Sequence, residues 1–344
     1  MESRNLIDTY QQKKSRKNLF ICFFSLSLLA LSFLISLSSG YISLTPTEIG
    51  QALLGRGTSA QNLILFQMRL PRITLSILIG VALALSGCLI QTVSKNPLAD
   101  PGFMGINAGA GLAVLLYTLC YEGNRLSKAL TLPLVAILGS GTAAFFIYKL
   151  AYRKGKGIQP IRLILTGIAV QAGISAVMTL LVIRLDDKQF DFVAAWQAGS
   201  ISGTSWQYVH MIWPWLVLIL PYIMSKRKIL NVLELGDMSA MSLGVDVEKE
   251  KKGLLVASVM LAGVSTAVSG NISFVGLLAP HLGRKLVGPN HRILLPVSGL
   301  IGGVLVSVAD TLARVIVQPS ELPTGIVVAI IGAPYFIYLL KRKA

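Results

Sequence analysis

The sequence predicts an all-α membrane protein in which about ten transmembrane helices form one bundle. Of the 344 residues, 53% are hydrophobic and only 13% are charged, about half the charged share of a soluble domain. The mean hydropathy is +0.69, and several stretches reach the ~20 apolar residues that a bilayer crossing requires. Helices are expected because a segment in lipid must satisfy its backbone hydrogen bonds internally, and the alternation of a membrane β-barrel is absent.

Ten apolar segments are candidates for these helices. The basic residues before the first segment could mimic the start of a signal peptide. However, the apolar run that follows is longer than the usual ~7–15 residues of a signal sequence. We therefore expect a cytoplasmic tail over 1–18 and one transmembrane permease domain over 19–344. The predicted spans are 19–38, 73–93, 103–121, 131–151, 161–183, 207–224, 253–268, 272–288, 293–317 and 324–341.

The distribution of positive charge decides between two topologies. Residues 253–283 could form one long helix, or two short helices separated near Asn271. With two helices, 23 of the 31 Lys and Arg residues lie on the side of the N-terminus and 8 on the other side. With one helix, the division becomes 18 to 13. Because Lys and Arg collect in cytoplasmic loops, we predict a multi-pass protein of the cell membrane with both termini in the cytoplasm.

Charge and cysteine usage exclude several classes of function. A net charge of +16 would suggest nucleic acid in a soluble protein, but here the basic residues lie between apolar segments and orient the chain, so no nucleic-acid partner is expected. Cys22, Cys88 and Cys120 lie far apart, which supports neither a zinc site nor a redox pair. P-loop, His-Glu-x-x-His and G-x-S-x-G motifs are absent. We expect no metal site, no cofactor and no catalytic residue.

Two predicted spans contain a short internal repeat. Residues 80–87 and 263–270 match at five of eight positions. In the favoured topology the two segments run in opposite directions, as in the inverted repeats of transporters. The alternative is chance, because Gly, Ala and Ser are common in packed membrane helices.

Acidic residues are nearly missing from the predicted spans. An ion-coupled carrier usually buries carboxylates along its path, and Asp310 is the main candidate. Arg314 follows four residues later, so the two side chains can simply pair on one helix face. The chain therefore resembles a pathway that takes its energy from a partner.

The connection 229–248 has the pattern of two short amphipathic helices. Gly236 and Gly244 interrupt it. A plain solvated or interface-lying connector is the alternative, but it would not need a recurring apolar face. The residues of that face are Leu235, Met238, Met241 and Leu243.

The segment Glu234–Gly244 resembles the coupling segment of FecCD-type permeases, the ABC-importer family for iron–siderophore complexes, haem and cobalamin. Further pieces match the family in order, and the resemblance covers about residues 40–342. Each piece is weak alone, whereas the ordered set is specific. The pieces are Arg69–Arg72, Ser86–Gly87, Asn96–Gly102, Arg162–Ala169, Trp196–Ser200, Phe274–His281, Glu321–Gly325 and Gly332–Phe336.

The resemblance implies a permease subunit of a binding-protein-dependent ABC importer. Such a subunit carries an iron(III)–siderophore-type chelate into the cytoplasm by ATP-driven alternating access. The implied partners are a second permease chain, identical or paralogous, two ATP-binding subunits that hydrolyse ATP, an extracellular or periplasmic substrate-binding protein, the chelate and membrane lipid. Because the chelator already ligates the iron, the pathway needs no cluster of Cys, His or carboxylate ligands.

The resemblance also implies three groups of site residues. Arg69, Arg72 and Arg314 would pair with glutamates of the binding protein; contacts with lipid headgroups or pairing within the chain are the alternatives. Asn96 and Leu98 would form a cytoplasmic gate, and an ordinary turn is the alternative. His281 and Arg284 are interpreted as structural. The ATPase-coupling residues would be Glu234, Leu235, Gly236, Asp237, Ala240, Leu243 and Gly244.

Two other functions stay open at this stage. An ion-coupled secondary transporter would need membrane acids along its path. A membrane enzyme would need a catalytic constellation, which the sequence does not offer. Hydroxamate, catecholate, citrate-type and corrinoid cargoes share the family scaffold, and the sequence does not choose among them.

Overall fold

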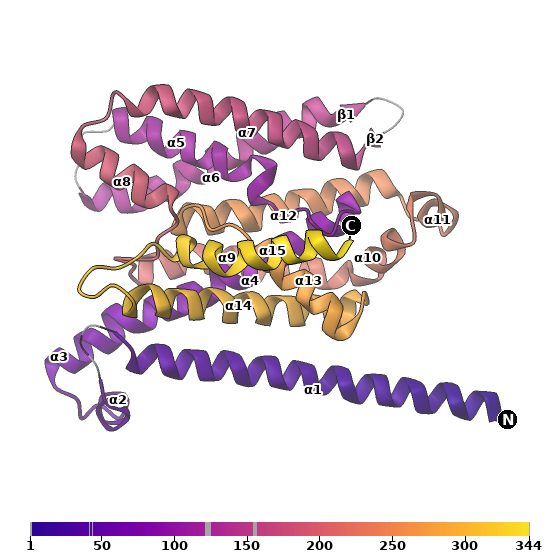
Figure 1. Cartoon of the computed structure of the whole chain (residues 1–344), viewed down its shortest axis with the longest axis horizontal. Coiled ribbons are helices and arrows are strands. Elements are labelled where there is room, and N and C mark those ends of the chain that lie inside the picture. The colour runs from indigo at the N-terminus through magenta and orange to yellow at the C-terminus, as the bar shows by residue number, and fades with distance from the viewer. Residues whose placement is uncertain (1, 41, 43, 121–124, 154–156, 344) are drawn as a thin grey trace.

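The computed structural model describes residues 2–40, 42, 44–120, 125–153 and 157–343. Almost all of this part of the chain is helical (Figure 1). The helices are α1 Glu2–Ser38, α2 Pro46–Leu53, α3 Ser59–Asn62, α4 Leu70–Ser94, α5 Ile106–Cys120, α6 Arg125–Ala151, α7 Pro160–Val182, α8 Asp187–Gln197, α9 Trp206–Ser225, α10 Arg227–Glu234, α11 Asp237–Ser242, α12 Val247–Ser269, α13 Val275–Val287, α14 His291–Val315 and α15 Thr324–Lys343. A π-helical turn, Leu63–Arg69, leads into α4, a 3-10 turn, Gly102–Met104, precedes α5, and β1 Tyr152–Arg153 pairs antiparallel with β2 Gly157–Ile158.

The predicted all-α bundle is confirmed. A helix lies at each of the ten predicted spans, namely α1, α4, α5, α6, α7, α9, α12, α13, α14 and α15. Within the described residues, seven helices are long and apolar enough to cross a membrane, and α5 and α15 are shorter apolar helices. The tail 1–18 is helical from Glu2 onward and continues into α1 without a break.

The predicted span 272–288 contains the shortest of the ten helices. Helix α13 has 13 residues, about 20 Å of length, which is too short for a hydrocarbon core of ~30 Å. The break near Asn271 is therefore longer than expected, and residues 270–274 cross part of the bundle without helical structure. Gly270 has φ +68°, and a Cβ there would lie 1.9 Å from the Trp196 carbonyl oxygen. Irregular backbone at membrane depth is tolerated only when protein surrounds it, which is the case here.

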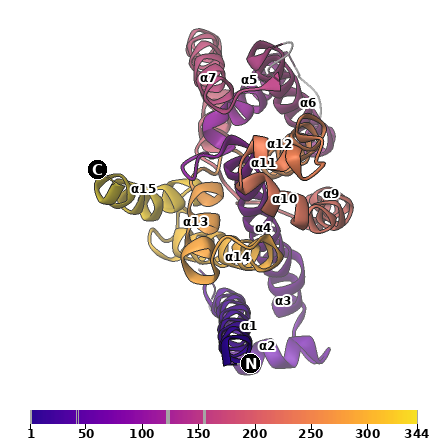
Figure 2. The ribbon, with the colours of Figure 1, turned by 90° about the vertical axis from the view of Figure 1, so that its right-hand side faces the viewer.

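Helix α4 lies in the middle of the bundle, between α12, α13 and α14 (Figure 2). Its glycines allow close helix contacts: a Cβ on Gly80 would lie 2.2 Å from the Gly302 carbonyl oxygen, and one on Gly87 would lie 1.9 Å from that of Gly276. Small residues bring membrane helices together in this way, because van der Waals packing rather than water exclusion drives their association.

The two ends of the bundle differ in their elements (Figure 1). One end, the α11 end, carries α10, α11, the start of α1 and the end of α15. The opposite end, the α8 end, carries α2, α3 and α8. Helix α4 runs toward the α11 end and α12 runs away from it, and Ser86 and Ser258 hydrogen-bond between them at 2.7 Å. The repeat segments thus lie on antiparallel, packed helices; their common origin stays a prediction.

Candidate functional site

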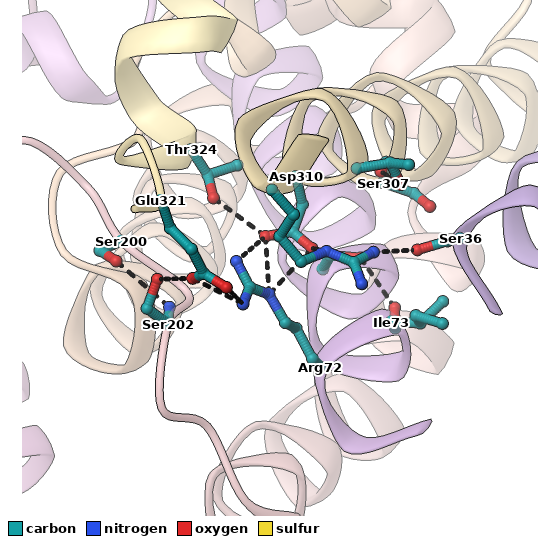
Figure 3. Close-up of polar contacts among 12 residues, drawn as sticks. Ser36, Arg72, Ile73, Ser200, Ser202, Ser307, Asp310, Glu321 and Thr324 are labelled. Carbon is teal, nitrogen blue, oxygen red and sulfur yellow. Dashed lines mark hydrogen bonds and ion pairs between the residues drawn. The ribbon is translucent and has the colours of Figure 1, made fainter. Parts of the chain in front are cut away.

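A buried ion-pair network lies at the α8 end, where α4 begins and α14 ends (Figure 3). Arg72 donates from Nε and NH2 to Asp310, over distances of 3.0–3.1 Å. The side chain of Asp310 is 1% exposed and that of Arg72 is 10% exposed. Thr324 Oγ1 donates a further hydrogen bond of 3.1 Å to Asp310 Oδ1. Two charges this deep are stable only because each is paired and hydrogen-bonded.

Glu321 covers the outward side of Arg72. Its carboxylate accepts hydrogen bonds of 2.8 Å from Arg72 NH1 and 2.6 Å from the Ser202 hydroxyl (Figure 3). Partial burial opposes ionisation, but the hydrogen bond from Ser202 and the charge of Arg72 outweigh it and lower the pKa of Glu321. The side chain is still 37% exposed, so it is the accessible member of the network.

The other two predicted docking arginines are also buried and bonded within the chain. Arg314 Nε lies 3.3 Å from Asp310 Oδ2, which confirms the predicted pairing of these two residues. Arg314 also donates to Ser36 at the end of α1. Arg69 donates to the carbonyl oxygens of Leu37 and Ile42, so it closes the C-terminal end of α1.

The three arginines thus lie together at the α8 end, but none is freely exposed. The pairing within the chain that the sequence left as an alternative is present for Arg72 and Arg314. Counting Arg69, the cluster holds three cations against the two carboxylates of Asp310 and Glu321. A net positive charge remains there, and a docking role for these arginines stays a prediction.

The predicted coupling segment forms two short helices at the α11 end. Helices α10 and α11 are separated by Gly236, which has φ +113°, and α11 ends before Gly244, which has φ +80°. Both values favour glycine over any residue with a Cβ. Leu230 and Leu233 anchor α10 in the bundle with no exposed surface, and Ala240 does the same for α11. The prediction of two helices broken at these glycines is confirmed.

The outer face of this segment is apolar and open. The exposed fractions are 66% for Leu235, 78% for Met238, 52% for Met241 and 64% for Leu243. Flexible methionines suit a surface that adapts to a partner. A contiguous exposed apolar face at an end of the bundle is typical of a protein interaction site.

Asp237 ties this segment to the bundle through two lysines. Its Oδ1 lies 2.7 Å from Lys95 Nζ, at the end of α4, and its Oδ2 lies 2.7 Å from Lys251 Nζ, near the start of α12. Partial burial opposes ionisation, but the hydrogen bonds from Lys251 and Lys95 outweigh it and lower the pKa of Asp237. The Lys251 side chain is only 3% exposed, so the Asp237 carboxylate is its main compensation.

Glu234 joins a second polar group at the same end. Its carboxylate lies 3.5 Å from Arg284 NH2, on α13. Arg284 NH1 donates to Gln91, on α4. His291, at the start of α14, hydrogen-bonds Thr92 at 3.0 Å and Asn231 at 2.9 Å. Arg284 is thus bonded within the chain, and its structural interpretation stays a prediction. Gln91 reaches Glu234 through Arg284, and Thr92 reaches Asn231 through His291, so the last turn of α4 is linked to the coupling segment by two bridging side chains.

The predicted gate follows directly after Lys95. This lysine has φ +49° and ends α4, and the Asn96 side chain accepts a 2.9 Å hydrogen bond from the Leu98 backbone N–H. That contact is the Asx turn expected of an Asn-Pro sequence. Leu98 is half-buried. A constricting role for Asn96 and Leu98 stays a prediction.

Sequence reasoning did not assign roles to Glu321, Lys95 or Lys251. Each lies far along the chain from its partner, so no local pattern connects them. A usable signal existed only for Lys95, an isolated charge between uncharged residues, which needs a carboxylate nearby when it is partly buried; Lys251 lies in the charged run 248–252, where the sequence does not single it out. Among the described residues, no group of three or more His, Cys, Asp or Glu side chains is arranged to hold a metal ion.

Comparison with known protein families matches residues 28–342 to the FecCD transport family. The chain is 44% identical to the iron(3+)-hydroxamate import system permease protein FhuG of Bacillus subtilis, over 96% of this chain and 98% of that protein. It is 39% identical to the Fe(3+) dicitrate transport system permease protein FecD of Escherichia coli, over 81% and 85% of the two chains. It is also 39% identical to the hemin transport system permease protein HmuU of Yersinia pestis, over 80% and 82%.

A solved structure agrees with the fold over nearly the whole chain. It is an inward-facing conformation of a metal-chelate-type ABC transporter. The similarity has a TM-score of 0.82 at 30% sequence identity and covers 94% of this chain and 99% of that chain.

Proposed function

The chain belongs to the FecCD transport family, and from this premise we propose that it is the permease subunit of an ABC importer that carries an iron(III)–siderophore chelate into the cytoplasm. The proposed cargo rests on the 44% identity with an iron(3+)-hydroxamate permease along nearly the full length of both chains. A hydroxamate-type chelate is therefore the first cargo to test, ahead of citrate complexes and haem.

The energy is proposed to enter through the α10–α11 segment. Leu235, Met238, Met241 and Leu243 offer an apolar face of the kind that binds in the groove of a partner, here one of two ATP-binding subunits. Glu234 and Asp237 connect that face to the end of α4, so a displacement of the segment reaches the turn at Asn96–Leu98. ATP hydrolysis takes place on the partner in this proposal.

The α11 end is proposed to face the cytoplasm. Both termini and the coupling segment lie at this end, and it also collects most of the Lys and Arg residues, as the positive-inside rule requires. The α8 end would then receive a substrate-binding protein at the cluster around Arg69, Arg72 and Arg314. A second permease chain, identical or paralogous, would complete the pathway.

The arrangement of Asp310 argues against an ion-coupled secondary transporter. A coupling carboxylate must be able to bind and release its ion. Asp310 is instead held by Arg72, Arg314 and Thr324 on three sides, with no exposed surface.

The test is uptake of radioactive iron by a strain that lacks its own hydroxamate permease. Cells that express the chain with its ATP-binding and substrate-binding partners should accumulate iron supplied as a hydroxamate chelate. Gly244→Asp and Glu234→Lys should each reduce uptake by about tenfold or more while the chain stays in the membrane. The left-handed backbone at Gly244 does not accept a side chain readily, and lysine at position 234 would face Arg284.

Two outcomes would contradict the proposal at different levels. Normal uptake by both variants, with the ATP-binding subunit still attached, would remove the coupling role of the segment. Accumulation of the chelate by the chain alone in liposomes, driven by a proton or sodium gradient, would remove the ABC mechanism itself.

A further inference from the structure

Helix α12 carries a ridge along the flank where it lies between α6 and α9 (Figure 2). Lys252, Val256 and Met260 follow each other at intervals of four residues and so share one helix face. The side chains of Val256 and Met260 are 47% and 40% exposed. The ridge begins at the α11 end and rises between two hollows.

The hollow on the α6 side is deep. It has a volume of about 510 Å³, and its floor reaches the buried residues Ile90 and Met104. A second hollow, of about 390 Å³, adjoins it beside Trp215. The two hollows share the lining residues Gly141 and Phe145. A Cβ added to Gly141 would meet no atom within 4 Å, so the hollow is open at this glycine.

The hollow on the α9 side has a volume of about 560 Å³ and lies between α9 and the ridge. Leu218 and Tyr222 form its α9 wall. Lys252 lines the hollows on both sides of the ridge, and Lys249 lines the one on the α9 side. Lys249 and Lys252 therefore form a cationic mouth from which both apolar hollows, called channels below, open.

The length of this flank matches one leaflet of a bilayer. From Lys252 to Val264, at the far end of the α6-side hollows, α12 advances by twelve residues, which is about 18 Å at ~1.5 Å per residue. Half of a hydrocarbon core of ~30 Å is about 15 Å. The mouth thus lies at headgroup depth when the rest of the hollow lies among the acyl chains.

The two lysines at the mouth, Lys249 and Lys252, differ from nearby lysines in having no ion pair among the described residues. Nearby lysines are compensated, since Lys226 lies 2.7 Å from Glu250 and Lys251 is paired with Asp237. In contrast, neither Lys249 nor Lys252 has a carboxylate oxygen within 4.0 Å among the described residues. Lys252 Nζ lies 5.8 Å from the ring centre of Tyr148, an aromatic residue of the kind found at membrane interfaces.

We propose that this flank is a binding site for one anionic diacyl phospholipid. Its phosphate lies between Lys249 and Lys252, and one acyl chain occupies the channel on each side of the Val256–Met260 ridge. The chemistry selects a lipid over a free anion because the hollows are apolar along their length. It selects an anionic headgroup because neither Lys249 nor Lys252 has an ion-pair partner among the described residues. Basic pockets between membrane helices bind acidic lipid headgroups by the same attraction.

The test is lipid retention by the purified full-length chain, measured by native mass spectrometry after reconstitution with equal amounts of phosphatidylglycerol and phosphatidylcholine. The wild type should retain one phosphatidylglycerol. The double variant Lys249→Gln/Lys252→Gln should lose affinity for it by about 30-fold, since each lysine near an anionic surface contributes a factor of ~5. Lys249→Arg/Lys252→Arg should restore retention.

Matched control variants distinguish the contribution of the lysine charges to lipid retention from that of the apolar hollow. Lys228→Gln removes an exposed lysine at the same end of the bundle that lines neither hollow, and should leave retention unchanged. Gly141→Leu places a side chain in the α6-side hollow, where an added Cβ meets no atom, and should lower retention of both lipids, whereas Gly173→Leu on α7, where an added Cβ is equally free, should not.

Three results would overturn the proposal: equal retention of the two lipids by the wild type, unchanged retention in the double lysine variant, or displacement of the lipid by excess inorganic phosphate. Disulfide-linked dimers formed through Met260→Cys would also overturn it, because a second protein chain would then cover the flank. None of these outcomes depends on which chelate the protein carries.

Discussion

The polar networks at the two ends of the bundle are built differently, although each joins a charged residue at one end of α4 to elements far along the chain. At the α8 end, Arg72 and Asp310 are almost fully enclosed. At the α11 end, the Asp237 and Lys95 side chains are 37% and 35% exposed. Water screens the second pair but hardly reaches the first.

This difference separates a fixed end from a movable end. Breaking the Arg72–Asp310 pair would leave buried charges only partly compensated, so α4 and α14 are held together there. The Asp237–Lys95 contact can open at low cost because both side chains are about one-third exposed and water can replace the contact in part; only the Asp237–Lys251 contact involves a buried lysine. A coupling segment must move against the bundle, and the half-exposed network permits that motion while the enclosed one supplies the pivot.

The largest expected effect is at the enclosed end. Asp310→Asn leaves Arg72 and Arg314 facing each other with only the half-exposed Glu321 carboxylate as a counter-charge, which should destabilise the fold by about 3–5 kcal/mol. The measurement is the apparent melting midpoint and the yield of monodisperse protein in detergent. Asp187→Asn, an exposed acid at the same end, is the control and should change neither. An unchanged midpoint for Asp310→Asn would erase the contrast between the two ends.

A smaller effect is expected at the movable end. Asp237→Asn removes the negative charge that the buried Lys251 faces but keeps an acceptor oxygen, and the side chain at this position is 37% exposed, so it should cost about 1–3 kcal/mol, less than the enclosed pair. Lys95→Gln removes only the exposed contact and should cost about 0.2–1 kcal/mol. Limited proteolysis within residues 235–245 should accelerate in that order. Equal cleavage of both variants and the wild type would show that these ion pairs do not hold the segment.

The stability difference between the wild type and Asp237→Asn should depend on pH. The pKa of Asp237 is lower in the folded chain than in the unfolded chain, so its contribution to stability is complete above the ordinary carboxyl pKa of about 4. It is lost as the pH falls through the lowered value. The difference in melting midpoint between wild type and Asp237→Asn should therefore be constant from pH 5 to 8 and shrink only in stronger acid.

The smallest expected effect concerns the exposed member of the enclosed network. Glu321→Gln keeps the hydrogen-bonding shape but removes the carboxylate that covers Arg72. If the substrate-binding protein docks with its own carboxylates, as proposed, its affinity should rise by about two- to fivefold at low salt, and the gain should fade as salt is added. Weaker docking would indicate that Glu321 itself contacts the partner.

Local features were readable from the chain. Hydropathy and length located a helix at every predicted span, because crossing a bilayer is a requirement on consecutive residues. Gly236 and Gly244 marked the ends of α11 because backbone conformation at a turn depends on the residue itself. The spacing of Asp310 and Arg314 predicted their contact, since residues four apart share a helix face.

Contacts between distant segments were decided by the tertiary structure alone. Arg72 and Asp310 are 238 positions apart, and the sequence around either residue does not identify the other as its partner. The interruption before α13 is stabilised by surrounding protein, so composition indicated a break but not a half-length helix. The hollows beside α12 exist because α6 and α9 pack at its two sides. Side-chain pairing and cavity shape depend on how helices are placed in three dimensions, whereas helix formation in lipid depends mainly on the local sequence.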